Sequence, residues 1–227
     1  MNENRIIWFF KEPRSGSTWL SVALSDKLNR LNKHVDKKVT THNDYNESFN
    51  SLTKNADLKD LKNTDWIYCT HFFEFLENMT YYENPILVRC NRKSIIDKVL
   101  STQIQDLSRG KFIHRYSDPI EDTLALNIFN HLMKTPINVH KQDVITTINS
   151  IMNRDQLWKT YSTNFENYTI VYEDCEKGVH LPIYEGTIKF GDYTDYVIKT
   201  PDYKRELFIN YDEVASWIDQ YYIPIRD

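Results

Sequence analysis

The chain has 227 residues, of which 41% are hydrophobic and 14% aromatic, so it is long enough to bury a substantial core. Its formal net charge is −4 and charges of both signs are spread along the sequence, which argues against a basic surface for nucleic acid or an anionic membrane. No apolar stretch approaches a bilayer span and the N-terminal apolar run is too short for a signal peptide, so we expect one cytoplasmic domain over residues 1–227 that contacts neither nucleic acid nor membrane.

Short β-type runs alternate with helical patterns in the first part of the chain. Residues 6–10 form an unbroken apolar run that is typical of a buried strand, and a turn-rich segment follows over 12–16. Helical spacing then continues over 19–31. Two further apolar runs, at 66–70 and 85–90, are flanked by polar residues and predict two more strands.

The same alternation continues toward the C-terminus. Ser94, followed three residues later by Asp97, has the form of a capping box, and a helical apolar stripe lies behind it. Helical patterns follow over 120–133 and 143–161, and a last strand over 168–172. This order predicts an α/β fold, with a central parallel sheet flanked by helices and a ligand site beyond the carboxyl ends of the strands. Those ends are expected just after residues 10, 70, 90 and 172.

The most informative segment lies between the first strand and the first long helix, over residues 11–20. A small, hydroxyl-rich turn at a helix N-terminus presents backbone N–H groups, side-chain hydroxyls and a positive dipole end, which together suit a phosphate. Arg14 adds a positive charge. The Lys-Ser/Thr pair of a Walker A loop is missing, so the parts of a P-loop kinase that bind Mg²⁺ and the γ-phosphate are not supplied. An ordinary turn capped by Ser17 or Thr18 is the alternative.

The run Pro13-Arg14-Ser15-Gly16-Ser17-Thr18-Trp19-Leu20 resembles the 5′-phosphosulfate loop of the sulfotransferases that use 3′-phosphoadenosine-5′-phosphosulfate (PAPS). In that family the loop is roughly Pro-Lys/Arg-Ser-Gly-Thr/Ser-Thr-Trp-Leu, and the Arg form is more similar to the bacterial, carbohydrate and tyrosylprotein branches. The resemblance implies a P-loop-NTPase-like sulfotransferase architecture, with PAPS as donor and no metal. It implies nucleotide contacts by Arg14, Ser15, Gly16, Ser17, Thr18 and Trp19.

A second pair of residues matches the family's 3′-phosphate site. There, an Arg at the end of a central strand and a Ser about two turns into the next helix hold the phosphate, and Arg92 and Ser101 are the matching pair. A guanidinium suits this task because it presents two parallel N–H donors. The interval is nine residues here and eight in the cytosolic branch, so the turn is one residue longer or another residue takes part. Arg89 competes for the role, although its place within an apolar strand favours a structural one.

Two further segments resemble family elements. Tyr172-Glu173-Asp174 is similar to the Tyr-Glu-Asp that ends a late strand, where the Tyr contacts adenine; a half-buried core tyrosine is the alternative, since the chain has fifteen tyrosines. Near the C-terminus the family has a basic loop over the 3′-phosphate, often Arg-Lys-Gly. That triplet is absent, and Lys199 and Lys204 are the substitutes, with solvated loop lysines as the alternative.

His71 is the predicted general base. Cys69-Thr70-His71 closes a short strand and resembles a Lys-Thr-His of the cytosolic branch, whose histidine takes the proton of the acceptor hydroxyl. Imidazole titrates near neutrality, so it accepts such a proton without a large pKa shift. The predicted catalytic residues are therefore Arg14, which stabilises charge on the leaving phosphate, and His71. Glu74 is the alternative base.

The resemblance thus implies transfer of a sulfuryl group from PAPS to a hydroxyl of a small-molecule or carbohydrate acceptor. Two alternatives stand beside it: a nucleotide or small-molecule kinase of related architecture, and a protein that binds PAPS or its bisphosphate product (PAP) without transfer. The three cysteines are far apart, which is typical of an intracellular protein with reduced thiols. The sequence predicts no metal site, because no His, Cys and carboxylate residues have ligand spacing.

Overall fold

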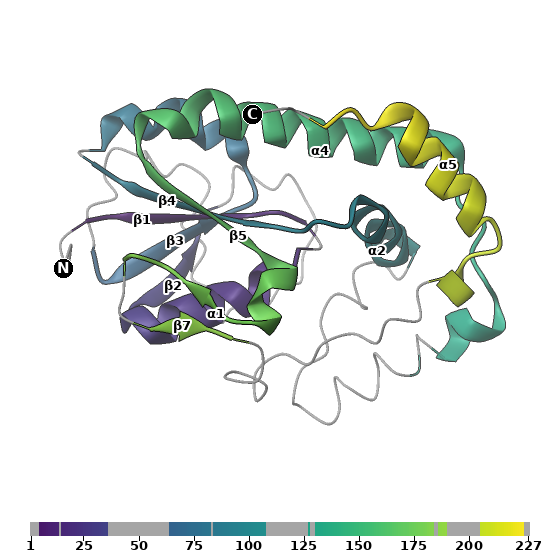
Figure 1. Ribbon diagram of the computed structural model, residues 1–227, viewed down its shortest axis with the longest axis horizontal. Helices are drawn as coiled ribbons and strands as arrows, with labels where there is room; N and C mark the ends of the chain where they lie inside the picture. Colours follow the sequence, from purple (N-terminus) through teal and green to yellow (C-terminus); the bar gives the residue numbers. More distant parts are fainter. Residues whose placement is uncertain are drawn as a thin grey trace. The chain divides into compact units, whose positions relative to one another are not determined.

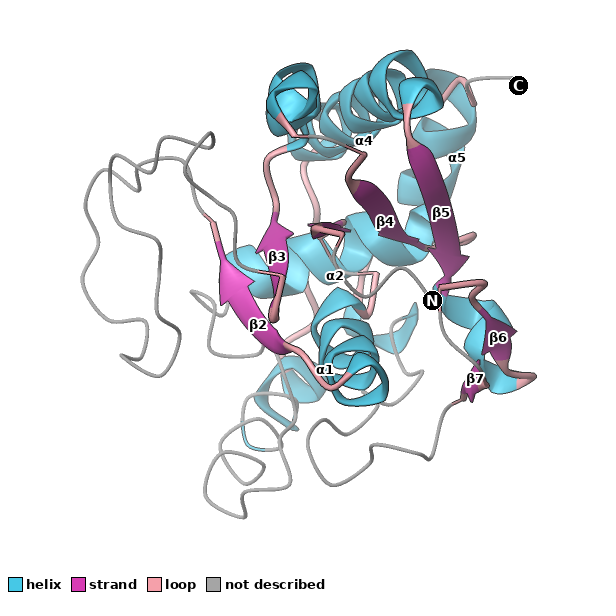
Figure 2. Cartoon of the chain, turned by 90° about the vertical axis from the view of Figure 1, so that its left-hand side faces the viewer, coloured by secondary structure: helices cyan, strands magenta, loops and turns pink. Residues whose placement is uncertain are grey.

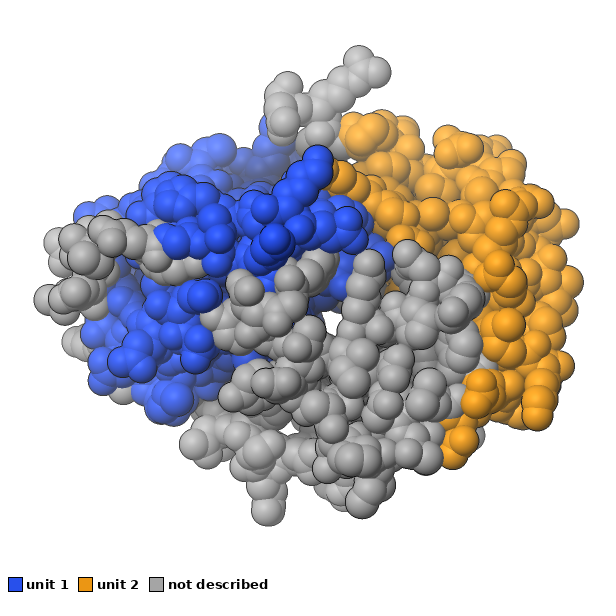
Figure 3. Space-filling model, turned by 60° about the horizontal axis from the view of Figure 1, so that its bottom comes forward, with its two compact units in different colours: residues 1–92, 156–192 blue, residues 93–155, 193–227 orange. Residues whose placement is uncertain are grey.

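The computed structural model in Figures 1 and 2 divides into two compact units. The first unit comprises residues 1–92 and 156–192, and the second comprises 93–155 and 193–227, as coloured in Figure 3. Each unit has a hydrophobic core of its own. The structure describes residues 5–13, 15–35, 64–82, 84–107, 127, 130–183, 186–189 and 205–224.

The first unit contains a five-stranded parallel sheet with the order β2-β3-β1-β4-β5. Its strands are β1 (Ile7–Lys11), β2 (Leu31–His34), β3 (Trp66–Thr70), β4 (Ile86–Asn91) and β5 (Glu166–Val171). The central strand β1 pairs on both sides, and Phe9 lies opposite Cys69 of β3 and Val88 of β4. The α/β class predicted from the sequence is therefore confirmed, with the three central strands at the predicted places.

Burial follows the position of each strand in the sheet. All residues of β1 are buried, and in β4 only Asn91 is partly exposed. Such continuous burial is expected of parallel strands that are covered on both faces. At the edge of the sheet, β5 instead alternates between more and less exposed positions over most of its length. The centre of the sheet is therefore buried, and the carboxyl ends of β1 and β4 lie next to each other.

The helix α1 (Ser17–Leu28) begins directly after the loop that follows β1 and packs against β1, β2 and β4 (Figure 1). It ends three residues before the predicted position. Asn29 has a φ of 50°, in the left-handed region, and the amide of Arg30 turns back to the carbonyl of Ser25. Asn is one of the few residues that tolerates this conformation at a helix end. The prediction of a helix over 19–31 is thus wrong at its end, and Leu31 opens the edge strand β2 instead.

An aromatic layer covers one face of the sheet. Trp8 and Phe10 of β1 and Tyr68 of β3 pack against the 3₁₀ segment η2 (Phe73–Tyr81). The Trp8 ring lies 5.5 Å from that of Tyr68, and the Phe10 ring 5.3 Å from that of Phe73, measured between centroids. Tilted and edge-on pairs at such separations add to the stabilisation from buried area. Aromatic side chains therefore bury this face of the sheet.

The rest of the first unit follows β5. A 3₁₀ turn η3 (Ser162–Asn164) precedes β5, and a second one, η4 (Tyr172–Glu176), follows it. The strands β6 (Val179–His180) and β7 (Thr187–Ile188) pair in antiparallel fashion. The strand predicted over 168–172 is therefore displaced: it ends at Val171, and Tyr172 belongs to the turn that leaves the sheet.

The second unit is helical over its described residues. It contains α2 (Ile95–Leu107), most of α4 (Lys141–Tyr161), the turn η5 (Arg205–Leu207) and α5 (Tyr211–Tyr221). The hydroxyl of Ser94 accepts a hydrogen bond from the amide of Asp97 at 3.2 Å, so the predicted N-terminal cap of α2 is confirmed. Of the helix predicted over 120–133, residues 127 and 130–133 are helical and the others lie outside the described residues.

The core of this unit joins α2, α4 and α5. Ile137 forms an isolated parallel bridge to Phe208, which ties the segment before α4 to the turn before α5. The buried apolar residues of the cluster come from all three helices and from that bridge: Val99, Leu100, Ile104, Ile137, Val139, Val144, Ile148, Ile151, Leu207, Phe208, Val214 and Ile218.

The strand order creates a topological switch point next to β1. The chain leaves β1 toward β2 on one side of the sheet, whereas it leaves β4 toward β5 on the other side. The segments that follow β1 and β4 therefore diverge, although the two strands are neighbours. In open parallel sheets ligands bind at such a place, beyond the carboxyl ends of the strands. The loop after Lys11 and the residues after Asn91 flank this point.

Candidate functional site

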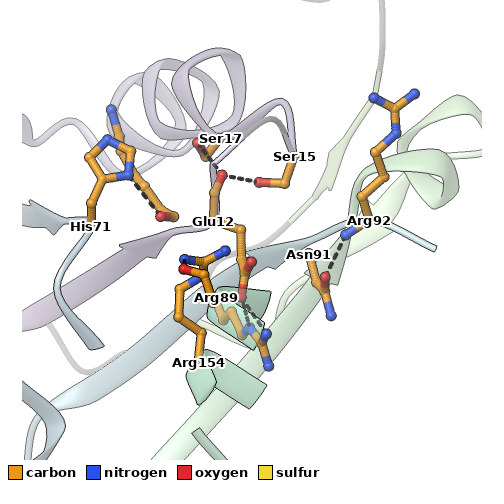
Figure 4. A network of polar contacts seen from close by, with 10 residues as sticks. Glu12, Ser15, Ser17, His71, Arg89, Asn91, Arg92 and Arg154 are labelled. Atoms are coloured by element: carbon orange, nitrogen blue, oxygen red, sulfur yellow. Dashed lines mark hydrogen bonds and ion pairs between the residues drawn. The ribbon is translucent and has the colours of Figure 1, made fainter. Parts of the chain in front are cut away.

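The loop between β1 and α1 is folded around one backbone carbonyl, that of Glu12. This oxygen accepts hydrogen bonds from the Ser15 hydroxyl at 2.7 Å, from the Ser15 amide at 3.3 Å and from the Ser17 hydroxyl at 3.2 Å. Both serine side chains are buried. Figure 4 shows their hydrogen bonds to Glu12. Their hydroxyls thus hold the loop in shape. Arg14, at the tip of the predicted loop, lies outside the described residues.

Gly16 is the N-cap of α1, and two features of the structure favour glycine there. Its φ is 73°, in the left-handed region that a residue with a Cβ adopts at a cost. A Cβ at this position would also lie 2.1 Å from Cδ2 of Tyr172, well inside van der Waals contact. The backbone of the loop therefore contacts the Tyr172 ring directly, and the ring leaves no space for a side chain at position 16.

A buried ion pair lies beneath the loop. The Arg89 guanidinium donates to the Glu12 carboxylate through both Nε, at 3.0 Å, and Nη2. The Arg89 side chain is 5% exposed and that of Glu12 is fully buried. Arg89 also lies over the rings of Phe73, at 5.3 Å, and Trp158, at 5.8 Å. Arg89 is therefore buried in a pair with Glu12, which agrees with the structural role that its place in a strand favours.

Arg92 follows β4 and is held by residues that follow β5. Its Nε donates to the Glu173 carboxylate at 3.2 Å, and its guanidinium carbon lies 5.4 Å from the centroid of the Tyr172 ring. The Arg92 amide is bonded to the side-chain oxygen of Asn91 at 2.7 Å, which sets the direction in which the chain leaves the strand (Figure 4). Arg92 is thus placed by a ring and a carboxylate from the neighbouring strand end.

The Tyr172 hydroxyl stays protonated over the whole neutral range. Desolvation by burial raises the pKa of Tyr172 to about 12, and the positive charge of Arg92 opposes this shift only in part. The ring is therefore a neutral aromatic surface for the guanidinium above it. An arginine at such a position is attracted by the electrons of the ring face.

His71 follows β3 and reaches the start of the loop. Its Nδ1 lies 2.9 Å from the carbonyl oxygen of Lys11, the last residue of β1 (Figure 4). A carbonyl oxygen only accepts, so Nδ1 carries the proton and Nε2 is the proton-accepting nitrogen of the neutral ring. His71 is exposed, as is Glu74, the alternative base, in η2. The hydrogen bond thus fixes the tautomer that a general base at this position needs.

The other predicted residues divide into three groups. Thr18 is half-buried and Trp19 is buried, both in the first turn of α1. Ser101 is buried in α2 and belongs to the second unit, whereas Arg92 belongs to the first. Lys199 and Lys204 lie outside the described residues.

Two carboxylates were absent from the sequence-based site. Glu12 and Glu173 each hold one of the two arginines, Arg89 and Arg92. For Glu12 a signal existed: it is an acidic residue between a fully apolar strand and a loop, where burial requires a cationic partner. For Glu173 the only signal was its place beside Tyr172. Neither partner follows from spacing, because the arginines lie 77 and 81 residues away along the chain.

Together these residues define an α/β protein whose first unit brings the ends of β1, β3, β4 and β5 to one candidate site. The described residues include no group of three or more His, Cys, Asp and Glu side chains that could hold a metal ion. None of the helices that the structure describes has the length and apolar character needed to cross a membrane. Comparison of the chain with protein-family models, curated proteins and solved structures finds no match.

Proposed function

We propose that the chain is a sulfotransferase that moves a sulfuryl group from PAPS to an acceptor hydroxyl. The observation that carries the proposal is the contact between Gly16 and Tyr172. It joins the two segments of the sequence that resemble the family, the loop over 13–20 and Tyr172-Glu173-Asp174. Both segments follow the carboxyl ends of strands, which is where ligands bind in open parallel sheets.

The loop and the arginines would bind the two phosphate-bearing ends of the nucleotide. The first turn of α1 has the positive dipole end and backbone N–H groups that suit the 5′-phosphosulfate. Arg14 is assigned to the same end by the resemblance. Arg92 follows the neighbouring strand and is assigned to the 3′-phosphate, because its pair with Glu173 is partly exposed whereas the pair of Arg89 with Glu12 is buried.

The proposed reaction is an in-line displacement at sulfur. The acceptor oxygen attacks sulfur, the bond from sulfur to the 5′-phosphate oxygen breaks, and the electron pair of that bond goes to the phosphate. The proton of the acceptor hydroxyl goes to Nε2 of His71, whose Nδ1 is bonded to the carbonyl of Lys11. The products are a sulfate ester and adenosine 3′,5′-bisphosphate. Arg14 and the loop N–H groups stabilise the charge that builds on the leaving phosphate.

Calorimetry and a transfer assay test the proposal in two steps. The full chain should bind adenosine 3′,5′-bisphosphate more tightly than ATP with Mg²⁺; the reverse order would favour the kinase alternative. Labelled sulfate should then pass from PAPS to at least one member of a panel of alcohols and sugars. Binding without any transfer would favour the alternative of a protein that binds PAPS but does not use it.

Two variants separate binding from chemistry. Arg14→Ala should weaken binding of the bisphosphate by roughly tenfold to a hundredfold, the worth of a hydrogen bond to a charged group, and lower transfer with it. His71→Ala should leave binding unchanged and slow transfer by roughly 10²- to 10⁴-fold. His180→Ala is the matched control, because His180 is also exposed and its Nδ1 also contacts a backbone carbonyl, that of Gly186, at 2.8 Å. Transfer that survives in His71→Ala as in His180→Ala would remove His71 from the mechanism.

A further inference from the structure

Tyr172 contacts both parts of the candidate site with one ring. Gly16 lies so close to its Cδ2 and Cε2 atoms that a Cβ would overlap them, at 2.1 and 2.2 Å. The Arg92 guanidinium lies over the same ring, 5.4 Å from its centroid. The loop after β1 and the arginine after β4 therefore both pack against the Tyr172 ring.

Glu173 completes the support of Arg92. Its carboxylate accepts a hydrogen bond from Nε at 3.2 Å, and the two side chains are only partly exposed, at 13% for Arg92 and 33% for Glu173. The ring and the carboxylate each restrict where the guanidinium can lie. Two consecutive residues of η4 thus both contact the Arg92 guanidinium.

We infer that Tyr172 and Glu173 are positioning residues that hold Arg92 and the Gly16 loop in one fixed arrangement, so that the 3′-phosphate and the 5′-end of the nucleotide are bound as a unit. The inference rests on the proposed function for the identity of the ligand. It differs from the role that the resemblance implies for the tyrosine, which is a contact to adenine. Here the ring acts through Gly16 and Arg92, and the hydroxyl has no part in it.

The quantity to measure is the gain in affinity that the 3′-phosphate provides. Calorimetry on the full chain gives it as the ratio of the dissociation constants of adenosine 5′-monophosphate and adenosine 3′,5′-bisphosphate. Tyr172→Leu should lower this ratio by roughly threefold to thirtyfold, the range expected for loss of a cation–π contact. Tyr172→Phe keeps the ring and should leave the ratio within about twofold of the original. A large loss in the Phe variant would instead indicate a role for the hydroxyl and would overturn the inference.

Glu173 provides a second test with less risk to folding, because its side chain is one-third exposed. Glu173→Ala should lower the ratio, and Glu173→Gln should restore most of it, since the amide oxygen still accepts from Nε of Arg92. A carboxylate that merely competes with the phosphate would give the opposite result, a higher ratio in both variants. That outcome would also overturn the inference.

A control and a double variant complete the design. Tyr211→Leu removes a ring that carries another guanidinium, that of Arg205 at 5.0 Å, in the second unit, and should leave the ratio unchanged. Combining Tyr172→Leu with Arg92→Ala should cost little beyond Arg92→Ala alone, because both changes remove the same contact. A ratio near one in the unaltered chain would refute the proposed function itself. A high ratio that is insensitive to Tyr172→Leu and Glu173→Ala would refute only the inference.

Discussion

Methionine in place of Arg89 removes the guanidinium and keeps an unbranched side chain of similar length. The contacts of that side chain with the rings of Phe73 and Trp158 are thereby largely retained, since methionine packs well against aromatic rings. What is lost is the buried ion pair between the guanidinium and the Glu12 carboxylate. Because the Glu12 side chain is fully buried, water cannot replace the lost hydrogen bonds without opening the core.

The size of the effect follows from this burial. Removing one member of a buried ion pair costs about 3–5 kcal/mol, because the remaining charge stays buried and loses that compensation. For a chain of this length each kcal/mol lowers the melting temperature by roughly 2–4 °C, so the expected fall is roughly 6–20 °C. The loop should loosen as well, since the carbonyl of Glu12 holds the hydroxyls of Ser15 and Ser17. Binding of adenosine 3′,5′-bisphosphate should therefore weaken with stability.

Urea unfolding followed by tryptophan fluorescence measures the change in the free energy of unfolding. Arg205→Met is the matched control: its ion pair with Asp212 has side chains that are 66% and 82% exposed, and such pairs contribute about 0–1 kcal/mol. The double variant of Arg89→Met with Glu12→Gln should be more stable than the sum of the two single changes by roughly 1–3 kcal/mol. Equal losses in Arg89→Met and Arg205→Met would show that the buried pair contributes no more to stability than the exposed one.

Two further predictions concern the loop glycine and acid stability. Gly16→Ala should lower the melting temperature and abolish bisphosphate binding. Gly178→Ala is the control and should cost only the backbone strain, because φ is also positive there, at 93°, but an added Cβ would lie 3.6 Å from its nearest neighbour, an atom of Thr187. Equal effects of the two changes would contradict the contact with Tyr172. The hydrogen bond from Tyr168 is the main reason that the pKa of Glu166 lies below 4.5, so this carboxylate stabilises the fold above pH 4.5 and the contribution is lost as pH falls through the lowered pKa. Urea unfolding between pH 3 and 6 should therefore show a smaller acid loss in Glu166→Gln than in the unaltered chain, and parallel curves would refute this.

The sequence predicted the centre of the sheet and the edge strand β5, but not the other edge strand, β2. The central strands are unbroken runs of apolar residues, and burial on both faces makes such runs visible in any sequence. The edge strand β2 has the residues Leu31, Asn32, Lys33 and His34, of which one is apolar. Its strand conformation comes from backbone pairing with β3 and not from a side-chain pattern. The signal that was available is Asn29, a residue favoured at helix C-termini.

The same distinction applies to the site. The loop was located because its composition is local: glycine, serines and a threonine between a strand and a helix. The side chains that contact the loop and Arg92 could not be located in this way, because their positions depend on strand order. Arg89 meets Glu12, and Arg92 meets Glu173, only because β4 lies between β1 and β5. Periodicity predicts strands, but it contains no information on which strands are neighbours.

Gly16 shows how a local motif and a distant contact support one another. From sequence, a glycine here indicates a tight turn, and the φ of 73° agrees with that. Asn or Asp tolerates such an angle as well, so backbone conformation alone does not restrict the position to glycine. The Tyr172 ring supplies the stricter requirement, since it fills the space that any Cβ would occupy. The requirement for glycine therefore depends on the position of Tyr172, whose ring also contacts Arg92. No pattern within the loop indicates either contact.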